Sequence, residues 1–129
     1  MTPEPELDPE ERRLLATGVV QFNQGLFFEA HDTLEDLWSG LRGPWRDFFQ
    51  GLIQTSVAFY HLGNGNLPGA ASLFRRALKR LRSYPERYYG FDLGAHRAEI
   101  EAWLARVESG EVEGIRVEDL PKWVFADAG

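Results

Sequence analysis

The sequence predicts an all-α protein, a compact single domain of about five antiparallel helices with an extended C-terminal strap. Apolar residues recur three and four positions apart through most of the chain, which is the period of an amphipathic helix. No segment alternates apolar and polar residues as a half-buried strand does. Short clusters of Gly, Pro and Asn separate the helical segments, and short connections favour antiparallel neighbours. A length of 129 residues allows one domain, predicted over 1–129, and excludes separate catalytic and binding domains.

The first two helices are predicted from their starting signals and their apolar stripes. Asp8 is an acidic N-cap, Pro9 suits the first helical position and Glu11 completes a capping box, so the first helix extends from there to about Phe22. Residues 23–25 form a turn. The second helix, over about residues 26–41, has the most regular stripe in the chain, formed by Phe27, Ala30, Leu34, Leu37 and Leu41.

The third helix is predicted over 44–62 and is expected to be the buried central helix. Its stretch 48–62 contains no Asp, Glu, Lys or Arg, yet it is too short and too polar to cross a membrane. After a turn over 63–66, Asn66 caps a fourth helix that ends at Tyr84-Pro85.

The last third of the chain is predicted to form the fifth helix and the strap. Asp92 caps the fifth helix, which ends near Gly110. Helical periodicity is lost over 111–129, so this tail is interpreted as an extended strap across the bundle. Its apolar anchors are Ile115, Val117, Leu120, Trp123 and Phe125.

Composition excludes several classes of protein. The chain has no cysteine, which removes disulfide frameworks, thiolate metal sites and cysteine nucleophiles. The N-terminus is acidic and lacks the pattern of a signal peptide, and no segment has the length of a membrane span, so a cytoplasmic protein is expected. Asn, Gln and Met are scarce and most basic residues are Arg, a composition that suggests a GC-rich or thermophilic source.

Charge is distributed unevenly along the chain. The net charge of -6 argues against general nucleic-acid binding, since phosphate contacts need an excess of Lys and Arg. Residues 1–41 contain nine acidic and two basic residues, whereas 70–91 contain six basic residues and one acidic residue. The basic fourth helix is interpreted as a solvated face that offsets acidic residues of the second helix such as Glu29, Asp32 and Asp36.

Two motifs resemble a known family. The runs FNQGLFFEAHDTLEDLW, over 22–38, and FFQGLIQTSVAFYHLGNGNLPGA, over 48–70, are similar to the signature of the bacterial and archaeal domain of unknown function 309. The resemblance covers about residues 12–84 and leaves helix five and the strap, 92–125, outside. It implies a compact helical bundle but no activity. The positions it emphasises are Asn23, Gly25, Glu29, His31, Glu35, Trp38, Gln50, Gly51, Gln54, His61, Asn66 and Gly69.

The candidate site combines polar side chains of the second and third helices. One row on the second helix steps by three and four residues through Phe28, His31, Glu35 and Trp38. A similar row on the third helix contains Gln50, Gln54, Val57 and His61. If the two helices pack antiparallel, as their short connection requires, the rows face one another and form a semi-buried His/Glu/Gln cluster. The predicted ligand-binding residues are His31, Glu35, Trp38, Gln50, Gln54 and His61.

Three functions are compatible with this cluster, and whether the protein is an enzyme stays open. The first is a binding or structural protein, whose partners are a small polar ligand or a second copy of the chain. The alternative is a metal-dependent hydrolase in which His31, Glu35 and His61 bind a divalent metal, with His31 and Glu35 as catalytic candidates. The spacing His-x3-Glu is not a zincin motif, so this signal is weak. The second alternative, a peptide- or RNA-binding scaffold, rests on fragments similar to a tetratricopeptide repeat and on the basic helix.

Overall fold

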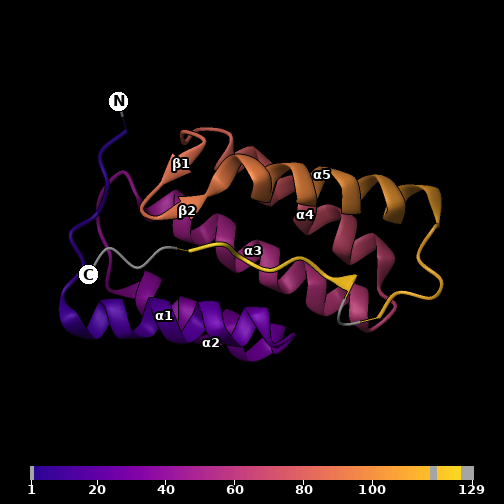
Figure 1. Ribbon diagram of the computed structural model, residues 1–129, viewed down its shortest axis with the longest axis horizontal. Helices are drawn as coiled ribbons and strands as arrows, with labels where there is room; N and C mark the ends of the chain where they lie inside the picture. The colour runs from indigo at the N-terminus through magenta and orange to yellow at the C-terminus, as the bar shows by residue number, and fades with distance from the viewer. Residues whose placement is uncertain (1, 117–118, 126–129) are drawn as a thin grey trace.

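The computed structural model describes residues 2–116 and 119–125 and has the predicted all-α architecture. Consecutive helices pack on one another, and Figure 1 shows α3 at the centre, with α1 and α2 along one edge and α4 and α5 along the other. The elements are α1 (Pro9–Asn23), α2 (Phe27–Ser39), α3 (Arg46–Gly63), α4 (Leu67–Leu81), β1 (Arg87–Tyr88), β2 (Phe91–Asp92) and α5 (Leu93–Ser109).

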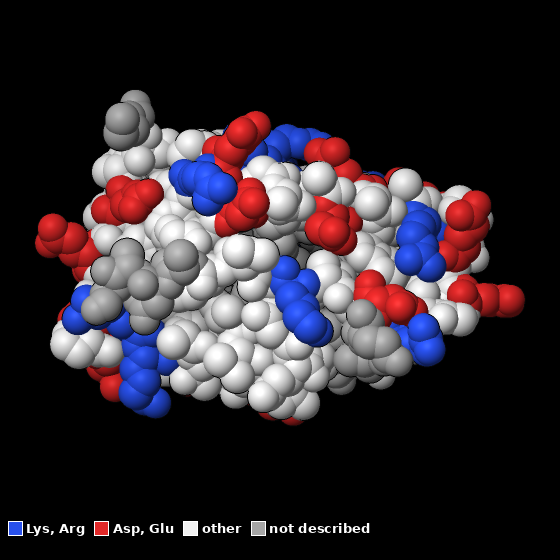
Figure 2. Space-filling model, viewed as in Figure 1, with Lys and Arg blue, Asp and Glu red and all other residues white. Residues whose placement is uncertain are grey.

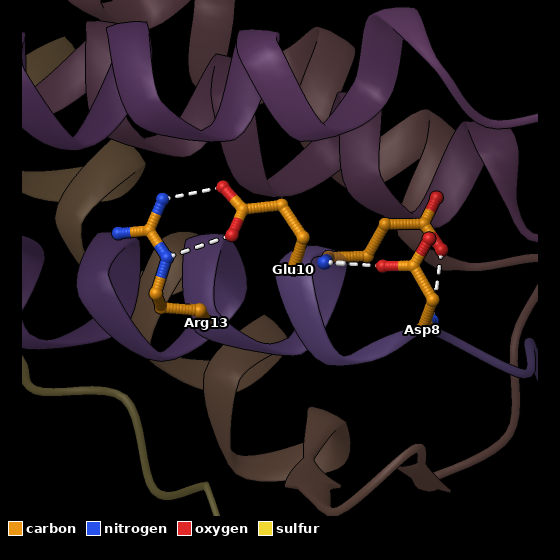
Figure 3. Close-up of polar contacts among 4 residues, drawn as sticks. Asp8, Glu10 and Arg13 are labelled. Carbon is orange, nitrogen blue, oxygen red and sulfur yellow. Dashed lines mark hydrogen bonds and ion pairs between the residues drawn. The ribbon is translucent and has the colours of Figure 1, made fainter.

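The N-terminus of α1 has the predicted capping box (Figure 3). The backbone N–H of Glu11 donates to Asp8 Oδ1 at 2.7 Å, and the N–H of Asp8 donates to Glu11 Oε1 at 2.9 Å. Glu10 and Arg13 form an ion pair one turn apart on the same exposed face. The two capping-box hydrogen bonds satisfy backbone N–H groups that a helix start leaves without a partner, so α1 begins where its sequence predicts.

Helix α3 is the buried centre of the molecule, as its uncharged sequence predicts. Phe48, Phe49, Leu52 and Phe59 are all within the core. Gly51 allows α4 to approach closely, since a Cβ at this position would lie 2.6 Å from Cδ2 of Leu81.

The start of α3 differs from the prediction. Pro44 does not open α3, which begins at Arg46. The preceding residue, Gly43, has a positive φ of 120°, so the chain is still turning at the proline.

A small hairpin joins α4 to α5 and was not predicted. Strands β1 and β2 pair antiparallel, with Tyr88 opposite Phe91, around a turn in which Tyr89 and Gly90 have positive φ. Two-residue strands are too short to show an alternating pattern in a sequence. The hairpin inserts Tyr88 into the core beside Phe48, and burial there raises the pKa of the Tyr88 hydroxyl.

The C-terminal segment crosses the bundle over α3 (Figure 1), so the strap predicted over 111–129 is confirmed for residues 119–125. The ring of Trp123 stacks on Phe22 with centroids 3.8 Å apart. Asn23 holds the strap, because its side chain accepts from the N–H of Trp123 at 2.7 Å and donates to the Trp123 carbonyl at 3.1 Å. Phe125 forms an isolated β-bridge with Phe91. Val117 and residues 126–129 lie outside the described residues.

Surface charges pair differently from the prediction. Arg80 of α4 pairs with Asp47 of α3, while Arg75 pairs with Glu108 of α5. The expectation that α4 offsets the acidic residues of α2 is therefore wrong, because α3 lies between the two helices and α4 meets α3 and α5 instead. Figure 2 shows both signs interspersed over α5 in this view. Within the described ranges, no helix is both long enough and apolar enough to span a membrane.

Candidate functional site

The predicted His/Glu/Gln residues do not form one cluster. His31 and His61 line a small cavity between α2 and α3, whereas Gln54 lines a groove between α3 and α4. Gln54 and His61 are seven positions apart, so a rise of about 10 Å separates them along the helix axis. Antiparallel packing places the N-terminal end of α2 beside His61 and the C-terminal end of α4 beside Gln54. The single cluster is thus corrected to two sites on different sides of α3.

The α2–α3 site is centred on His31. Nε2 of His31 lies 3.1 Å from Oε2 of Glu35, one turn along the same helix. Nδ1 lies 3.4 Å from Oδ1 of Asp32 but is not hydrogen-bonded. A nitrogen of His31 and one oxygen from each carboxylate all lie within 4.8 Å of one another, close enough to share a cation. The His31 side chain is 22% exposed and that of Glu35 is 53% exposed, so this group is open to solvent.

His31 also lines a small cavity together with aromatic rings. The cavity here has a volume of about 100 Å³. Phe28 and Tyr60 are exposed by 47% and 39%, and their ring centroids are 5.4 Å apart. Phe28 also lies 5.6 Å from the ring of His31. The full lining consists of Phe27, Phe28, His31, Val57, Tyr60 and His61.

The other predicted residues have separate surroundings. Nδ1 of His61 is 3.3 Å from the side-chain amide nitrogen of Asn66, the N-cap of α4. Trp38 is half-buried under the guanidinium of Arg46, which lies 3.7 Å from the ring centroid, and it does not line the His31 cavity. Gln50 is half-buried and lines neither the cavity nor the groove.

The α3–α4 site is a groove of about 510 Å³. It is lined by Asp47, Gln54, Arg76, Lys79, Arg80 and Ser83. Gln54 is 8% exposed, and its Oε1 is buried without a hydrogen-bond partner. Buried polar atoms are nearly always bonded, so Oε1 of Gln54 is a candidate acceptor for a water or a ligand.

Two features of these sites were missed by sequence reasoning. Asp32 is a surface acid in the sequence interpretation, and helical spacing gave no signal for its approach to His31, because adjacent residues on a helix do not face each other. His96 is not among the predicted site residues, and no pattern in the sequence indicates its burial. Nε2 of His96 lies 3.5 Å from Oγ1 of Thr55, and burial lowers the pKa of His96 to about 3, with the charge of Arg97 as a smaller cause.

Residues 15–73 match the family model described as Domain of unknown function (DUF309). The predicted resemblance to this family is confirmed. The matched segment contains all of α2 and α3, and therefore His31, Glu35, Gln54 and His61, but it ends before the basic residues of the groove.

A curated relative from Aquifex aeolicus (strain VF5), described as an uncharacterized protein, is 30% identical over 101 residues. This match covers 78% of the chain but 30% of the relative, so the chain spans less than a third of that protein's length. Neither this description nor that of the DUF309 family states an activity.

Proposed function

We propose that this protein is a binding protein whose α2–α3 face takes the alkylammonium group of a small organic cation. The observation that carries the proposal is a cavity open to solvent: His31 is partly exposed there beside Phe28 and Tyr60, whose rings are also partly exposed. A cluster that served only to fix helix packing would be sealed from solvent and fully bonded. This difference supports binding over a purely structural role.

The aromatic rings determine the class of ligand. A cation placed over an aromatic face is attracted by the ring quadrupole, and aromatic cages recognise quaternary ammonium groups in this way. Phe28 and Tyr60 provide two partly exposed rings at the same cavity. The carboxylates of Asp32 and Glu35 do not line the cavity, but they lie beside His31 and add a negative field near it. Apolar walls with carboxylates nearby favour an alkylated cation over a strongly hydrated one.

The size of the cavity limits what enters it. Pockets that enclose a whole drug-sized molecule are roughly 300–1,000 Å³. A cavity of about 100 Å³ accommodates only a head group. The remainder of the ligand therefore lies over the exposed surface, where Glu29 and Asp32 add to the acidic charge of α2.

The test compares a cation with a neutral molecule of the same shape. We expect tetramethylammonium to shift the amide NMR signals of Phe28 and Tyr60 saturably, and tert-butanol to bind at least about fivefold more weakly, a difference of roughly 1 kcal/mol. Phe28→Leu keeps the apolar contact but removes the aromatic face, so it should weaken tetramethylammonium binding. Val20→Ala is the matched control, because Val20 is an exposed apolar residue of α1 outside the cavity. Equal affinity for the two probes would contradict the proposal.

Binding of a divalent metal is the second candidate, and the grouping of His31, Asp32 and Glu35 favours it. Imidazole and carboxylate ligands suit Zn²⁺, Mn²⁺ or Fe²⁺. In this set Asp32 replaces His61, which the sequence predicted as the third ligand and which lies beside Asn66. Three protein ligands leave a coordination position open for water, so the hydrolase alternative, with His31 and Glu35 as catalytic candidates, depends on this metal.

Substitutions separate the two candidates. His31→Ala should abolish calorimetric binding of Zn²⁺ or Mn²⁺, whereas Phe28→Leu should leave it unchanged. A metal-dependent hydrolase would also cleave a chromogenic ester in the presence of the metal, and His31→Ala would not. Metal binding that survives His31→Ala would contradict the metal site. The peptide- or RNA-binding scaffold and the homo-oligomer stay predictions.

A further inference from the structure

The groove between α3 and α4 has features that the α2–α3 site does not use. Its floor contains the Gln54 side chain, which is more than nine-tenths buried and forms no hydrogen bond through Oε1. An amide can turn either its oxygen or its N–H₂ towards the groove by rotation about its last bond. In the structure it is Oε1 that is buried without a protein partner.

The wall of the groove is basic. Arg76, Lys79 and Arg80 lie three and four positions apart on α4, so they share one face of that helix. Arg80 is paired with Asp47, which also lines the groove. Arg76 and Lys79 are exposed and have no ion-pair partner among the described residues. Two positive charges are therefore free to meet an anion at the edge of the buried Gln54 amide.

We infer that this groove binds a small phosphorylated molecule that carries a hydroxyl or amino group. A phosphate monoester has a charge of about -1.5 to -2 near neutral pH and three strong acceptor oxygens, which matches two free cations and the hydroxyl of Ser83 better than a single carboxylate does. A volume of about 510 Å³ exceeds the space that a phosphate group fills. The organic part of the ligand extends over Gln54, whose amide bonds to its hydroxyl or amino group.

A small molecule fits these observations better than a nucleic acid. Contacts to a nucleic-acid backbone are made by Lys and Arg spread over an exposed surface, and they need no buried amide. Gln54 lies at the floor of the groove, where a flexible small ligand can reach it. The net charge of -6 also opposes a long polyanion while leaving a local basic site effective.

The test uses glycerol 3-phosphate, inorganic phosphate and glycerol as probes on the full chain. We expect glycerol 3-phosphate to bind most tightly in NMR titrations, inorganic phosphate more weakly and glycerol not at all. Gln54→Ala should weaken glycerol 3-phosphate binding about tenfold and bring it close to that of inorganic phosphate. Arg76→Ala and Lys79→Ala should weaken both phosphate probes. The melting temperature of Gln54→Ala should not fall steeply, because Oε1 of Gln54 bonds to no protein group.

Arg75→Ala is the matched control, since Arg75 lies on the same helix but pairs with Glu108 outside the groove. It should leave all three affinities unchanged. The inference is overturned if glycerol 3-phosphate causes no saturable shifts at about 10 mM, or if Gln54→Ala binds it as the parent does. It is also overturned if a short single-stranded RNA binds far more tightly than glycerol 3-phosphate and Gln54→Ala leaves that binding intact. That result would make α4 a nucleic-acid surface.

Discussion

His96 should make the stability of this protein depend on pH below neutrality. Its ring is enclosed between α5, Thr55 of α3 and Trp123 of the strap. Burial lowers the pKa of His96 from the ordinary 6.5 to about 3, so the folded protein holds this imidazole neutral. The unfolded chain binds a proton at this residue below about pH 6.5, whereas the folded chain does not. The contribution of neutral His96 to the free energy of unfolding is therefore fully present above that pH and is lost as the pH falls towards 3.

The size of the effect follows from the two pKa values. One pKa unit corresponds to about 1.4 kcal/mol, so a difference of about 3.5 units is worth roughly 5 kcal/mol once the loss is complete. Between pH 7 and pH 5 the expected loss from His96 alone is about 2 kcal/mol. This is a large fraction of the free energy of unfolding of a typical domain, about 5–15 kcal/mol.

Urea unfolding of the parent and of His96→Gln at pH 7 and pH 5 tests this reasoning. The variant cannot be protonated, so its free energy of unfolding should fall by about 2 kcal/mol less than that of the parent over this interval. His31 and His61 are present in both proteins, so their contributions cancel in the difference. Parallel pH dependence in the two proteins would refute the view that His96 is held neutral by burial.

Two further predictions concern packing and the strap. Gly51→Ala should destabilise the fold by about 1–3 kcal/mol in a thermal melt, because the new Cβ would lie 2.6 Å from Leu81. Gly63→Ala is the control: no atom lies within 4 Å of its Cβ, so this variant should be neutral or slightly stabilising. Asn23→Ala removes both bonds to the backbone of Trp123, so hydrogen exchange of the Trp123 amide should accelerate by an amount corresponding to about 1–3 kcal/mol. Gln24→Ala is the control, and unchanged exchange in Asn23→Ala would show that stacking on Phe22 holds the strap by itself.

The helices could be predicted from the sequence because their signals are local. Asp8, Asn66 and Asp92 cap helices as predicted. A cap is a local signal, because its short polar side chain accepts a hydrogen bond from the backbone N–H only three residues later. The hairpin could not be predicted, because Tyr88 and Phe91 are held there by long-range packing against Phe48. Tertiary contacts of this kind leave no periodic signal in a two-residue strand.

The candidate site was predicted less well than the fold. Helical spacing correctly indicated that His31 and Glu35 are neighbours, since residues four apart share a helix face. The same spacing placed Gln54 with them, which is wrong, because a row along α3 meets a different helix at each end. Spacing within one helix cannot determine which neighbour each turn meets. That depends on how α2 and α4 pack on α3.

Six of the residues emphasised by the DUF309 resemblance fall into two groups once their contacts are known. One group has a structural explanation: Asn23 bonds to the strap, Gly25 has a φ of 79°, and Gly51 allows α4 to approach. Asn66 caps α4 in the same sense. Replacing any of these residues perturbs the fold directly, so their presence in a motif needs no ligand.

The other group has no such explanation. The Gln54 amide has a buried atom without a partner, and Nδ1 of His31 is likewise buried and unbonded. A polar atom buried without a bond costs about 1–3 kcal/mol. A leucine at position 54 would avoid that cost. These two unsatisfied atoms distinguish His31 and Gln54 from the motif residues that build the bundle, and they are the reason that we propose binding on both sides of α3.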